Sequence, residues 1–465
     1  MSRPQIGRTI RRLRAERSLT QQALAARLGI SASYLNLIEH DQRTVTASLL
    51  FKLTEALGVE LAALSGQAER QLETTLREVV SDPALALEAV PEEELRALAG
   101  TAPNAARAVL ALYRAWRVAR EDAAGISLPS GRRVILPNDE ARDFFHERAN
   151  HFPALEAVAE RIGAEIGTRP SEMNHAVAER LRGRHGVQVT VGPLPGAMRR
   201  YDPEARRLSL AEALPRESRG FQMAFQLMLL EAREAVDALL SPAPSTPDAA
   251  ALIRVGLLNY AAAALLMPYA PFMHAASELR HDVDLLAARF GVSFEQACQR
   301  LTTLQRDGAR GVPFFFLSVD PAGNIGKRFS ATSFPFARFG GSCPRWVVHT
   351  AFQTPGALRV EVAELPDGAA FLCFARTVTD PALRWGEPRP THVIAMGCDV
   401  GRAADVVYAD GLDLNAARVG IGLSCRLCDR ADCRSRAFPP LEHRLVVNPE
   451  ETGVTPYRFE RAGRG

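Results

Sequence analysis

The feature that most constrains this chain is a pair of short helical patterns joined at a glycine, in TQQALAARLGISASYLNLIE near the N-terminus. Thr20 and Ser31 each precede apolar residues at helical spacing, and each can cap a helix by accepting a hydrogen bond from a backbone N–H. Gly29 permits the sharp turn between the helices, and the small Ala25 lets them approach. Helices this short bury their apolar faces only by packing on one another, so the segment predicts a compact helical unit.

A basic amphipathic helix precedes this pair, and an apolar helix follows it. Ile6, Ile10 and Leu13 repeat at helical spacing with arginines on the opposite face, and 47–57 carries four leucines before Gly58 ends the helix. The arrangement predicts a helix-turn-helix, and over roughly residues 5–60 it resembles the phage-repressor type. That resemblance implies that the third helix enters the major groove of DNA. A helical bundle used for protein contact is the alternative.

The resemblance also assigns contacts to single residues. Gln21 resembles the glutamine that positions a phosphate, and Arg43 lies where the DNA backbone passes. Tyr34 and Asn36 are the expected base contacts, because asparagine bonds adenine bidentately and tyrosine can touch a thymine methyl. One such domain covers half of a typical operator, so a homodimer or higher homo-oligomer on double-stranded DNA is expected. The predicted DNA-binding residues are Gln21, Ser31, Ala32, Ser33, Tyr34, Asn36 and Arg43.

The composition is that of a soluble globular protein with several domains. The chain has 465 residues, of which 23% are charged, and a net charge of +3. It has no apolar run long enough to span a bilayer, and arginines occupy the place of a signal's apolar core. We therefore expect a cytoplasmic protein without a membrane segment. The expected division is 1–66 helix-turn-helix, 67–145 helical linker, 146–319 middle domain and 320–465 C-terminal domain. The linker pattern fits dimerisation or packing on the next domain, and both readings stay open.

The middle domain reads as mainly helical and contains GFQMAFQLMLLE and, further on, LNYAAAALLMP. These segments resemble the zinc-binding helices of the ImmA/IrrE metallopeptidase-like family. Such enzymes require HExxH, in which two histidines bind zinc and the glutamate acts as base. Here those positions are Phe225, Gln226 and Leu229, and the acidic ligand falls on Leu257 or Leu258. We expect the scaffold without the chemistry and no catalytic residues; an active metallopeptidase is disfavoured.

After Gly311 the pattern changes to buried strands. VPFFFLSVD, LRVEVAE, AAFLCFARTV, THVIAM and DVVYA read as strands, with a hairpin signal at Pro366-Asp367-Gly368. The predicted fold class is therefore multidomain: an all-α helix-turn-helix, a mainly α metallopeptidase-like middle domain, and an α+β C-terminal domain built on an antiparallel sheet.

The seven cysteines are an odd number, which disfavours a disulfide framework in a long intracellular chain. Cys425, Cys428 and Cys433 form C-x2-C-x4-C, a spacing at which three thiolates can converge on zinc or an iron–sulfur cluster. Cys398 is the leading fourth ligand. Three reduced thiols without a metal are the alternative for the site, and a redox-sensing or iron–sulfur-sensing regulator is the alternative for the protein.

Several C-terminal segments resemble the short-chain fatty acyl-CoA regulators, among them RFSATSFPFARFGGSCPRWVVHTAF, MGCDVGRAADVVYADGLDL and CRLCDRADCRSRAFPPL. That family consists of bacterial transcription factors that respond to acyl-CoA thioesters such as propionyl-CoA and control carboxylic-acid assimilation genes. Some members are associated with an iron–sulfur cluster at the C-terminal cysteines. The resemblance implies a sequence-specific regulator, and no enzyme, with a short-chain acyl-CoA as effector.

Binding of an acyl-CoA requires cations for its phosphates and apolar surface for its acyl group. Phe329, Phe334 and Phe336 can line an acyl or adenine slot; plain core packing is the alternative for each. Solvated surface charge is the alternative for each arginine. The predicted ligand-binding residues are Lys327, Arg328, Arg338, Phe339, Arg345 and Arg436.

Overall fold

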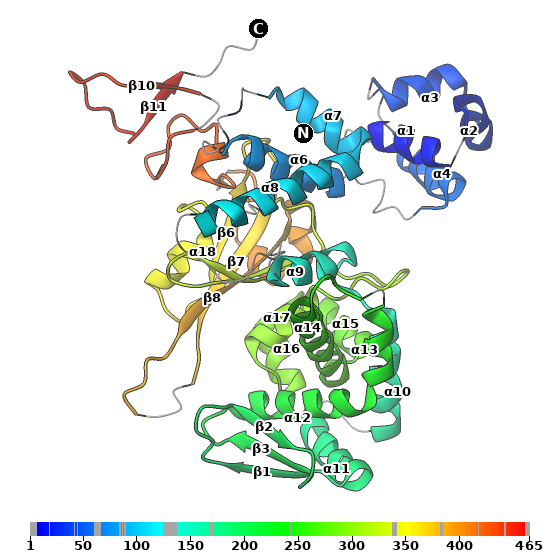
Figure 1. Ribbon diagram of the computed structural model, residues 1–465, viewed down its shortest axis with the longest axis vertical. Coiled ribbons are helices and arrows are strands. Elements are labelled where there is room, and N and C mark those ends of the chain that lie inside the picture. The colour runs from blue at the N-terminus through cyan, green and yellow to red at the C-terminus, as the bar shows by residue number, and fades with distance from the viewer. Residues whose placement is uncertain are drawn as a thin grey trace.

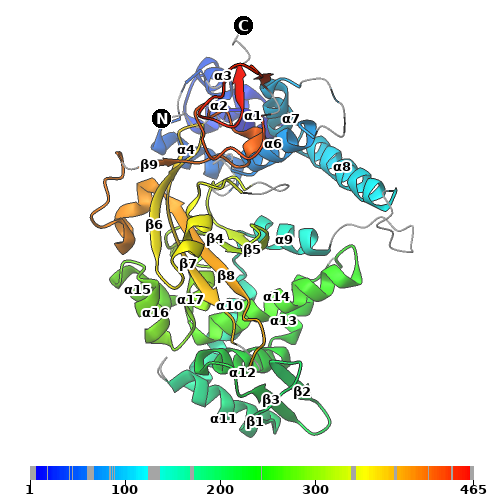
Figure 2. The same ribbon diagram turned by 90° about the vertical axis from the view of Figure 1, so that its left-hand side faces the viewer.

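The computed structural model describes residues 7–17, 19–40, 42–43, 45–59, 67–82, 85, 87, 90–123, 137–167, 172–241, 243–336, 342–381, 385–416, 418–440 and 443–460. Figures 1 and 2 show an elongated molecule with small N-terminal helices at one end and a small sheet at the other. A larger sheet lies between them.

The N-terminal helices form as predicted and enclose a core of their own. The Thr20 and Ser31 hydroxyls accept hydrogen bonds from the N–H groups of Ala23 and Tyr34, and Gly29 adopts a φ of 69°. The predicted Ile6 lies outside the described residues. The core includes Ile10, Leu24, Leu28, Leu35 and Leu53. The helices are α1 (Gly7–Glu16), α2 (Gln21–Leu28), α3 (Ala32–Glu39) and α4 (Ala47–Leu57).

The linker forms a second helical unit with a separate small core. Its helices are α6 (Gln67–Val80), α7 (Glu92–Thr101) and α8 (Pro103–Ala123). Leu76, Leu95 and Leu110 pack together in its core. Helix α7 packs on α1, so this unit adjoins the N-terminal helices directly.

The middle domain is mainly helical, as predicted, with a three-stranded sheet at its end in the order β1-β3-β2. Two of its features were not predicted. The helix expected over 218–240 is divided at Ala232 into two, and the strand β2 was missed because its residues Arg199–Asp202 carry no apolar alternation. The elements are α9 (Pro137–Glu147), α10 (Pro153–Ile166), α11 (Met173–His185), β1 (Gln188–Gly192), β2, β3 (Arg207–Ala211), α12 (Arg216–Glu231), α13 (Arg233–Leu239), α14 (Pro247–Leu266), α15 (Tyr269–Glu278), α16 (Val283–Phe290) and α17 (Phe294–Leu301).

The C-terminal part is built on a six-stranded sheet in the order β5-β4-β8-β7-β6-β9. Its pairs are antiparallel except β6 with β9. The segment DVVYA, predicted as a strand, forms 3-10 turns instead, because its backbone bonds to Arg280 and His281 rather than to a neighbouring strand and Val406 is buried. The elements are β4 (Phe315–Val319), β5 (Ile325–Ser330), α18 (Val347–Thr350), η3 (Ala351–Gln353), β6 (Arg359–Glu364), β7 (Ala370–Thr379), β8 (Thr391–Asp399), η4 (Val400–Asp405), η5 (Val407–Ala409), β9 (Arg418–Gly420), η6 (Cys425–Leu427), β10 (Arg444–Val446) and β11 (Arg458–Glu460).

Both faces of this sheet are buried, and each packs against a different part of the chain. Because side chains alternate along a strand, Leu372 and Met396 point to the middle-domain helices and share their core; we call this the helix face. Phe371 and Ala395 point to the opposite side and pack under α18 and Trp346; we call this the aromatic face. The sheet starts with β4, ahead of the division expected at 319/320, so the middle and C-terminal parts share one core.

Among the described residues, one helix is long and apolar enough to cross a bilayer by length and composition. It is α14, with a mean hydropathy of 1.7, and 56% of its apolar window is buried inside the protein. It packs against α9, α10, α12 and α17, so we interpret it as the central helix of this core.

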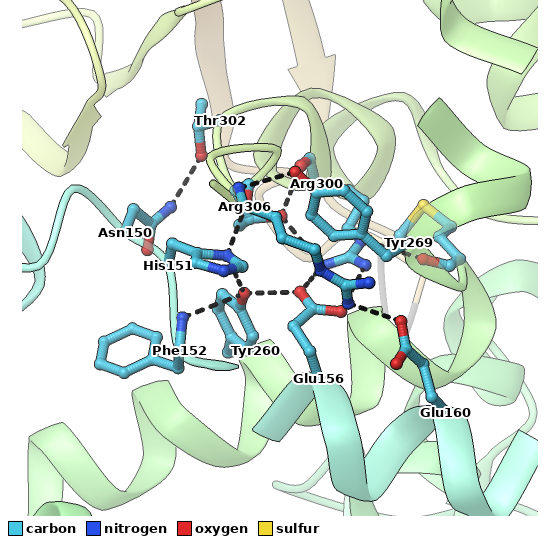
Figure 3. A network of polar contacts seen from close by, with 12 residues as sticks. Asn150, His151, Phe152, Glu156, Glu160, Tyr260, Tyr269, Arg300, Thr302 and Arg306 are labelled. Atoms are coloured by element: carbon cyan, nitrogen blue, oxygen red, sulfur yellow. Dashed lines mark hydrogen bonds and ion pairs between the residues drawn. The ribbon is translucent and has the colours of Figure 1, made fainter. Parts of the chain in front are cut away.

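A buried ion pair joins three of the middle-domain helices (Figure 3). The Arg300 guanidinium lies 2.6 Å from the Glu156 carboxylate, and neither side chain is more than 1% exposed. Tyr260 donates a hydrogen bond to Glu156 at 2.6 Å, and Arg300 donates to the Met267 carbonyl. Burial alone would raise the pKa of Glu156, but the charge and hydrogen bonds of Arg300 outweigh burial and hold that pKa below its ordinary value.

We predict that Arg300→Met lowers the free energy of unfolding by about 3–5 kcal/mol, because it leaves the Glu156 charge buried without a counter-ion. The double variant Arg300→Met/Glu156→Met should lose less than Arg300→Met alone. Urea titration of the full chain measures both. The exposed pair of Arg161 and Glu165 is the matched control, and Arg161→Met should cost under about 1 kcal/mol. Equal costs for the buried and exposed variants would contradict the prediction.

Candidate nucleic-acid interface and pocket

The third helix presents a polar outer face. Ser33, Asn36 and His40 are exposed and follow one another at helical spacing, while Leu35 and Ile38 point into the core. The His40 ring contacts the Asn36 carbonyl at 2.8 Å and so extends this face by one turn. His40 was not among the predicted residues, although its spacing from Asn36 could have indicated it.

A buried carboxylate orients the polar side chains behind this face. Glu39 is 1% exposed and accepts hydrogen bonds from Arg14 at 2.6 Å and from the Gln21 amide at 2.7 Å. The same Gln21 amide donates to Asn36 Oδ1 at 3.2 Å. The hydrogen bond with Glu39 raises the pKa of Arg14. The network ties α1, α2 and α3 together and holds the exposed Asn36 side chain through its Oδ1.

The other predicted interface residues have mixed positions. Ser31 caps α3, and Ser33 and Arg43 are exposed. Ala32 and Tyr34 are only partly exposed, and both pack against the helical core. The structure therefore brings Gln21 and Asn36 together and gives Tyr34 a largely packing position.

An arginine contacts two of the residues that stand at the positions of the HExxH motif. Arg199 donates to Gln226 Oε1 at 2.9 Å, and its guanidinium carbon lies 4.2 Å from the centre of the Phe225 ring. Gln226 is fully buried, and burial lowers the pKa of Arg199. Within the described ranges, no three His, Cys, Asp or Glu side chains are grouped to hold a metal ion.

A narrow pocket opens on the aromatic face of the large sheet, with room for about one water molecule. The rings of Phe334 and Trp346 stack at 5.2 Å, and those of Phe334 and Phe336 lie 4.8 Å apart. The pocket is lined by Ile325, Phe334, Pro335, Phe336, Ser342, Trp346, Gly422 and Leu423.

The predicted cations do not all reach this pocket. The Arg328 guanidinium lies 5.3 Å from the centre of the Phe336 ring, on the aromatic face. Arg345 precedes Trp346 on the same side, where its charge acts on Glu361. Lys327 points the other way, because neighbours on a strand alternate, and pairs with Glu295 at 2.8 Å. The predicted Arg338 and Phe339 lie outside the described residues.

The prediction that Arg436 binds the ligand needs correction. Its side chain is 3% exposed and donates to the carbonyls of Cys425, Cys428 and Arg430 at 2.6–2.9 Å. A guanidinium enclosed in this way organises the cysteine loop and offers no surface to a phosphate.

The cysteine that lies next to the loop of Cys425, Cys428 and Cys433 is not the predicted Cys398. Burial raises the pKa of Cys343, and the nearby thiols of Cys425 and Cys428 raise it further; Cys433 acts on Cys428 in the same way. Cys398, the predicted fourth ligand, points to the helix face and shares the middle-domain core. The sheet separates Cys398 from the thiols of the loop, and Cys343 is the thiol adjacent to the loop.

A partly buried carboxylate bonds to the residue that follows Trp346 of the pocket wall. The Val347 N–H at the start of α18 donates to Glu361 Oε1 at 2.8 Å. Burial raises the pKa of Glu361 to about 7, although this hydrogen bond and the charge of Arg345 lower it.

Because the folded state holds a proton on Glu361 that the unfolded chain has already released, we predict that stability falls as pH rises from about 4.5 to 7. Urea midpoints of the full chain across this range measure the effect, which should be on the order of 1–3 kcal/mol. Glu361→Gln should remove this part of the pH dependence, whereas the exposed Glu212→Gln should retain it. An identical pH profile for both variants would disprove the assignment.

Family models match three parts of the chain. A helix-turn-helix model matches residues 10–64, the IrrE N-terminal-like domain matches 182–302, and the C-terminal domain of the short-chain fatty acyl coenzyme A regulators matches 303–457.

Proteins of similar length match almost from end to end. The propionyl-CoA carboxylase regulator of Cereibacter sphaeroides is 42% identical over 97% of this chain and 98% of that protein. The transcriptional regulators RamB and PrpR of Mycobacterium tuberculosis are each 39% identical over 98% of this chain and cover 99% and 96% of their own lengths. A solved structure of a Mycobacterium tuberculosis transcriptional regulator has a TM-score of 0.67 and 40% identity, covering 70% of this chain and 99% of that one.

Proposed function

Because the chain belongs to the short-chain fatty acyl coenzyme A regulator family, we propose that a short-chain acyl-CoA, of the propionyl-CoA kind, controls its binding to an operator. The protein is a helix-turn-helix transcriptional regulator and not an enzyme, as its named relatives are regulators. The proposed targets are genes of carboxylic-acid or acyl-CoA assimilation, and the proposed site of action is the cytoplasm, where the DNA lies. The observation that carries this proposal is the 42% identity to a propionyl-CoA carboxylase regulator over 97% of the chain.

For DNA recognition, we propose that the exposed face of α3 enters the major groove. Asn36 contributes the base contact, and Glu39 fixes its orientation through Gln21. Ser31, Ala32, Ser33 and Tyr34 line the approach, and Arg43 reaches the backbone. One such face reads one half-site, so a homodimer on a two-fold operator is part of the proposal.

We predict that Asn36→Ala weakens operator binding by about 1–3 kcal/mol, through the loss of a bidentate base contact. Ser48→Ala, on the exposed side of α4, should leave it unchanged. The salt dependence of binding should persist in both variants, because the phosphate contacts remain. Fluorescence anisotropy at several salt concentrations measures both quantities. Equal affinities for wild type and Asn36→Ala would refute the base contact.

For the effector, we propose the pocket of Phe334, Phe336 and Trp346 as the slot for the acyl group. Arg328 and Arg345, on the same face, supply positive charge for the phosphates. The pocket is narrow as it stands, so entry of an acyl group requires its wall to move. The alternation along β5 gives Lys327 to the opposite side, and we assign it no ligand contact.

We predict that calorimetric titration detects propionyl-CoA binding, with free CoA binding more weakly. Arg328→Met should weaken propionyl-CoA by about tenfold, because a hydrogen bond to a charged group is lost. Lys327→Met alters the adjacent residue on the other face of the sheet and should have no effect. Absence of binding by every CoA thioester tested would overturn the effector proposal and leave DNA recognition intact.

A second function, redox or iron–sulfur sensing, is favoured by the thiols beside the pocket. We propose Cys343, Cys425, Cys428 and Cys433 as the residues that would hold an iron–sulfur cluster or zinc. As described, these thiols are not grouped closely enough to form a metal site, so the loop would have to close around the group. Thiolates suit both groups, and Arg436 holds the loop that carries three of them. Gly422 fits the arrangement, because a side chain there would lie 2.8 Å from Cys428 Sγ.

We predict that protein purified without oxygen contains iron and sulfide, or zinc, and that Cys343→Ser loses the metal. Cys398→Ser should retain it, because its thiol lies across the sheet. Metal and sulfide analysis of the variants gives a readout independent of DNA binding. Full metal content in Cys343→Ser would refute this ligand set, and operator affinity that follows the cluster but ignores acyl-CoA would favour redox sensing.

A further inference from the structure

A side chain of the linker holds the wall of the pocket by two hydrogen bonds. The Gln71 amide, on α6, donates through Nε2 to the Phe336 carbonyl at 3.1 Å and accepts at Oε1 from the Phe336 N–H at 3.3 Å. One primary amide thus satisfies both backbone groups of one residue, much as a neighbouring strand would. The two residues lie 265 positions apart.

Phe336 is part of the pocket rather than a remote surface residue. Its ring packs against Phe334 at 4.8 Å and against Phe315 of β4 at 5.4 Å, and it is 4% exposed. Arg328 lies over the same ring. A displacement of this segment therefore changes the shape of the pocket, and a molecule that widens the pocket displaces this segment.

On its other side, α6 leads to the DNA-binding helices. It shares the linker core with α7, and α7 packs on α1. Helix α1 carries Arg14, which binds Glu39 at the end of α3. A continuous set of packed helices therefore runs from Phe336 to the residues behind the proposed base contact (Figures 1 and 2).

We infer that Gln71 is the residue that couples the pocket to the DNA-binding domain. The inference rests on the proposed function and deepens it. The pocket holds about one water molecule with the Gln71 contact made, so an acyl group enters only when the Phe334–Phe336 wall moves. The two hydrogen bonds of Gln71 then shift or break, and α6 changes its position relative to the C-terminal sheet. Effector and operator thus favour different arrangements of one contact, as linkage requires.

The first test uses the full chain and a duplex selected by the wild-type protein from a random pool. Operator Kd is measured with and without saturating propionyl-CoA. Gln71→Met keeps the side-chain length and removes both hydrogen bonds. We expect the effect of propionyl-CoA on operator Kd to fall from about tenfold in wild type, within the usual range for coupled sites, to less than twofold. The exposed Gln188→Ala is the control and should respond like wild type. A full response in Gln71→Met would overturn the inference.

The second test needs no effector and separates this inference from the proposed function. Phe334→Leu alters the pocket wall, and its effect on operator Kd is measured in the wild-type and Gln71→Met backgrounds. We expect Phe334→Leu to change operator Kd at least threefold in the wild-type background and less than 1.5-fold in the Gln71→Met background. Such non-additivity is expected of coupled residues. Equal shifts, or no shift in the wild-type background, would disprove the coupling. If no CoA thioester binds but the effects of Phe334→Leu and Gln71→Met on operator Kd are non-additive, only the effector proposal fails.

Discussion

The rest of the structure depends on a sheet that is buried on both faces. Strand alternation sends Leu372 and Met396 into the core of the middle domain and their neighbours into the aromatic face. A sheet covered on both sides cannot tilt against the middle domain without breaking close packing. The middle and C-terminal parts therefore share one core, and a change of arrangement costs least at the edges of that core. The Gln71 contact with Phe336 lies at such an edge.

The degenerate peptidase scaffold acquires a physical role from the same constraint. A zinc site would have supplied a charged centre linking α12 to its surroundings. Here Arg199, stacked on Phe225 and bonded to Gln226, supplies a cation from the protein itself. The buried pair of Arg300 and Glu156 joins the remaining helices. These paired polar groups fix how the middle-domain helices pack, and the helices in turn cover one face of the sheet.

Much of the fold followed from local sequence signals, whereas the site followed only in part. Caps and a glycine turn are local, so the helix bounds around Thr20 and Ser31 were predictable. The face of the sheet to which a cysteine or a cation points depends on strand register. Residue spacing in the sequence does not determine that register. Cys398 and Lys327 were misplaced for this reason. Cys343 was not chosen as a ligand, because the cysteine loop that it adjoins is distant in sequence. Arg436 resembled a phosphate ligand until its burial was known.

The proposed effector pocket and the cysteine loop lie side by side. Ser342 and Gly422 line the pocket, and Cys343 and Cys428 lie beside them. Any group held by these thiols would brace one wall of the pocket, while the Gln71 amide braces the other through Phe336. With one wall held by ligation, the pocket would yield at the wall that two hydrogen bonds hold. An acyl-CoA bound as proposed would then displace the Phe334–Phe336 segment and α6 rather than the cysteine loop.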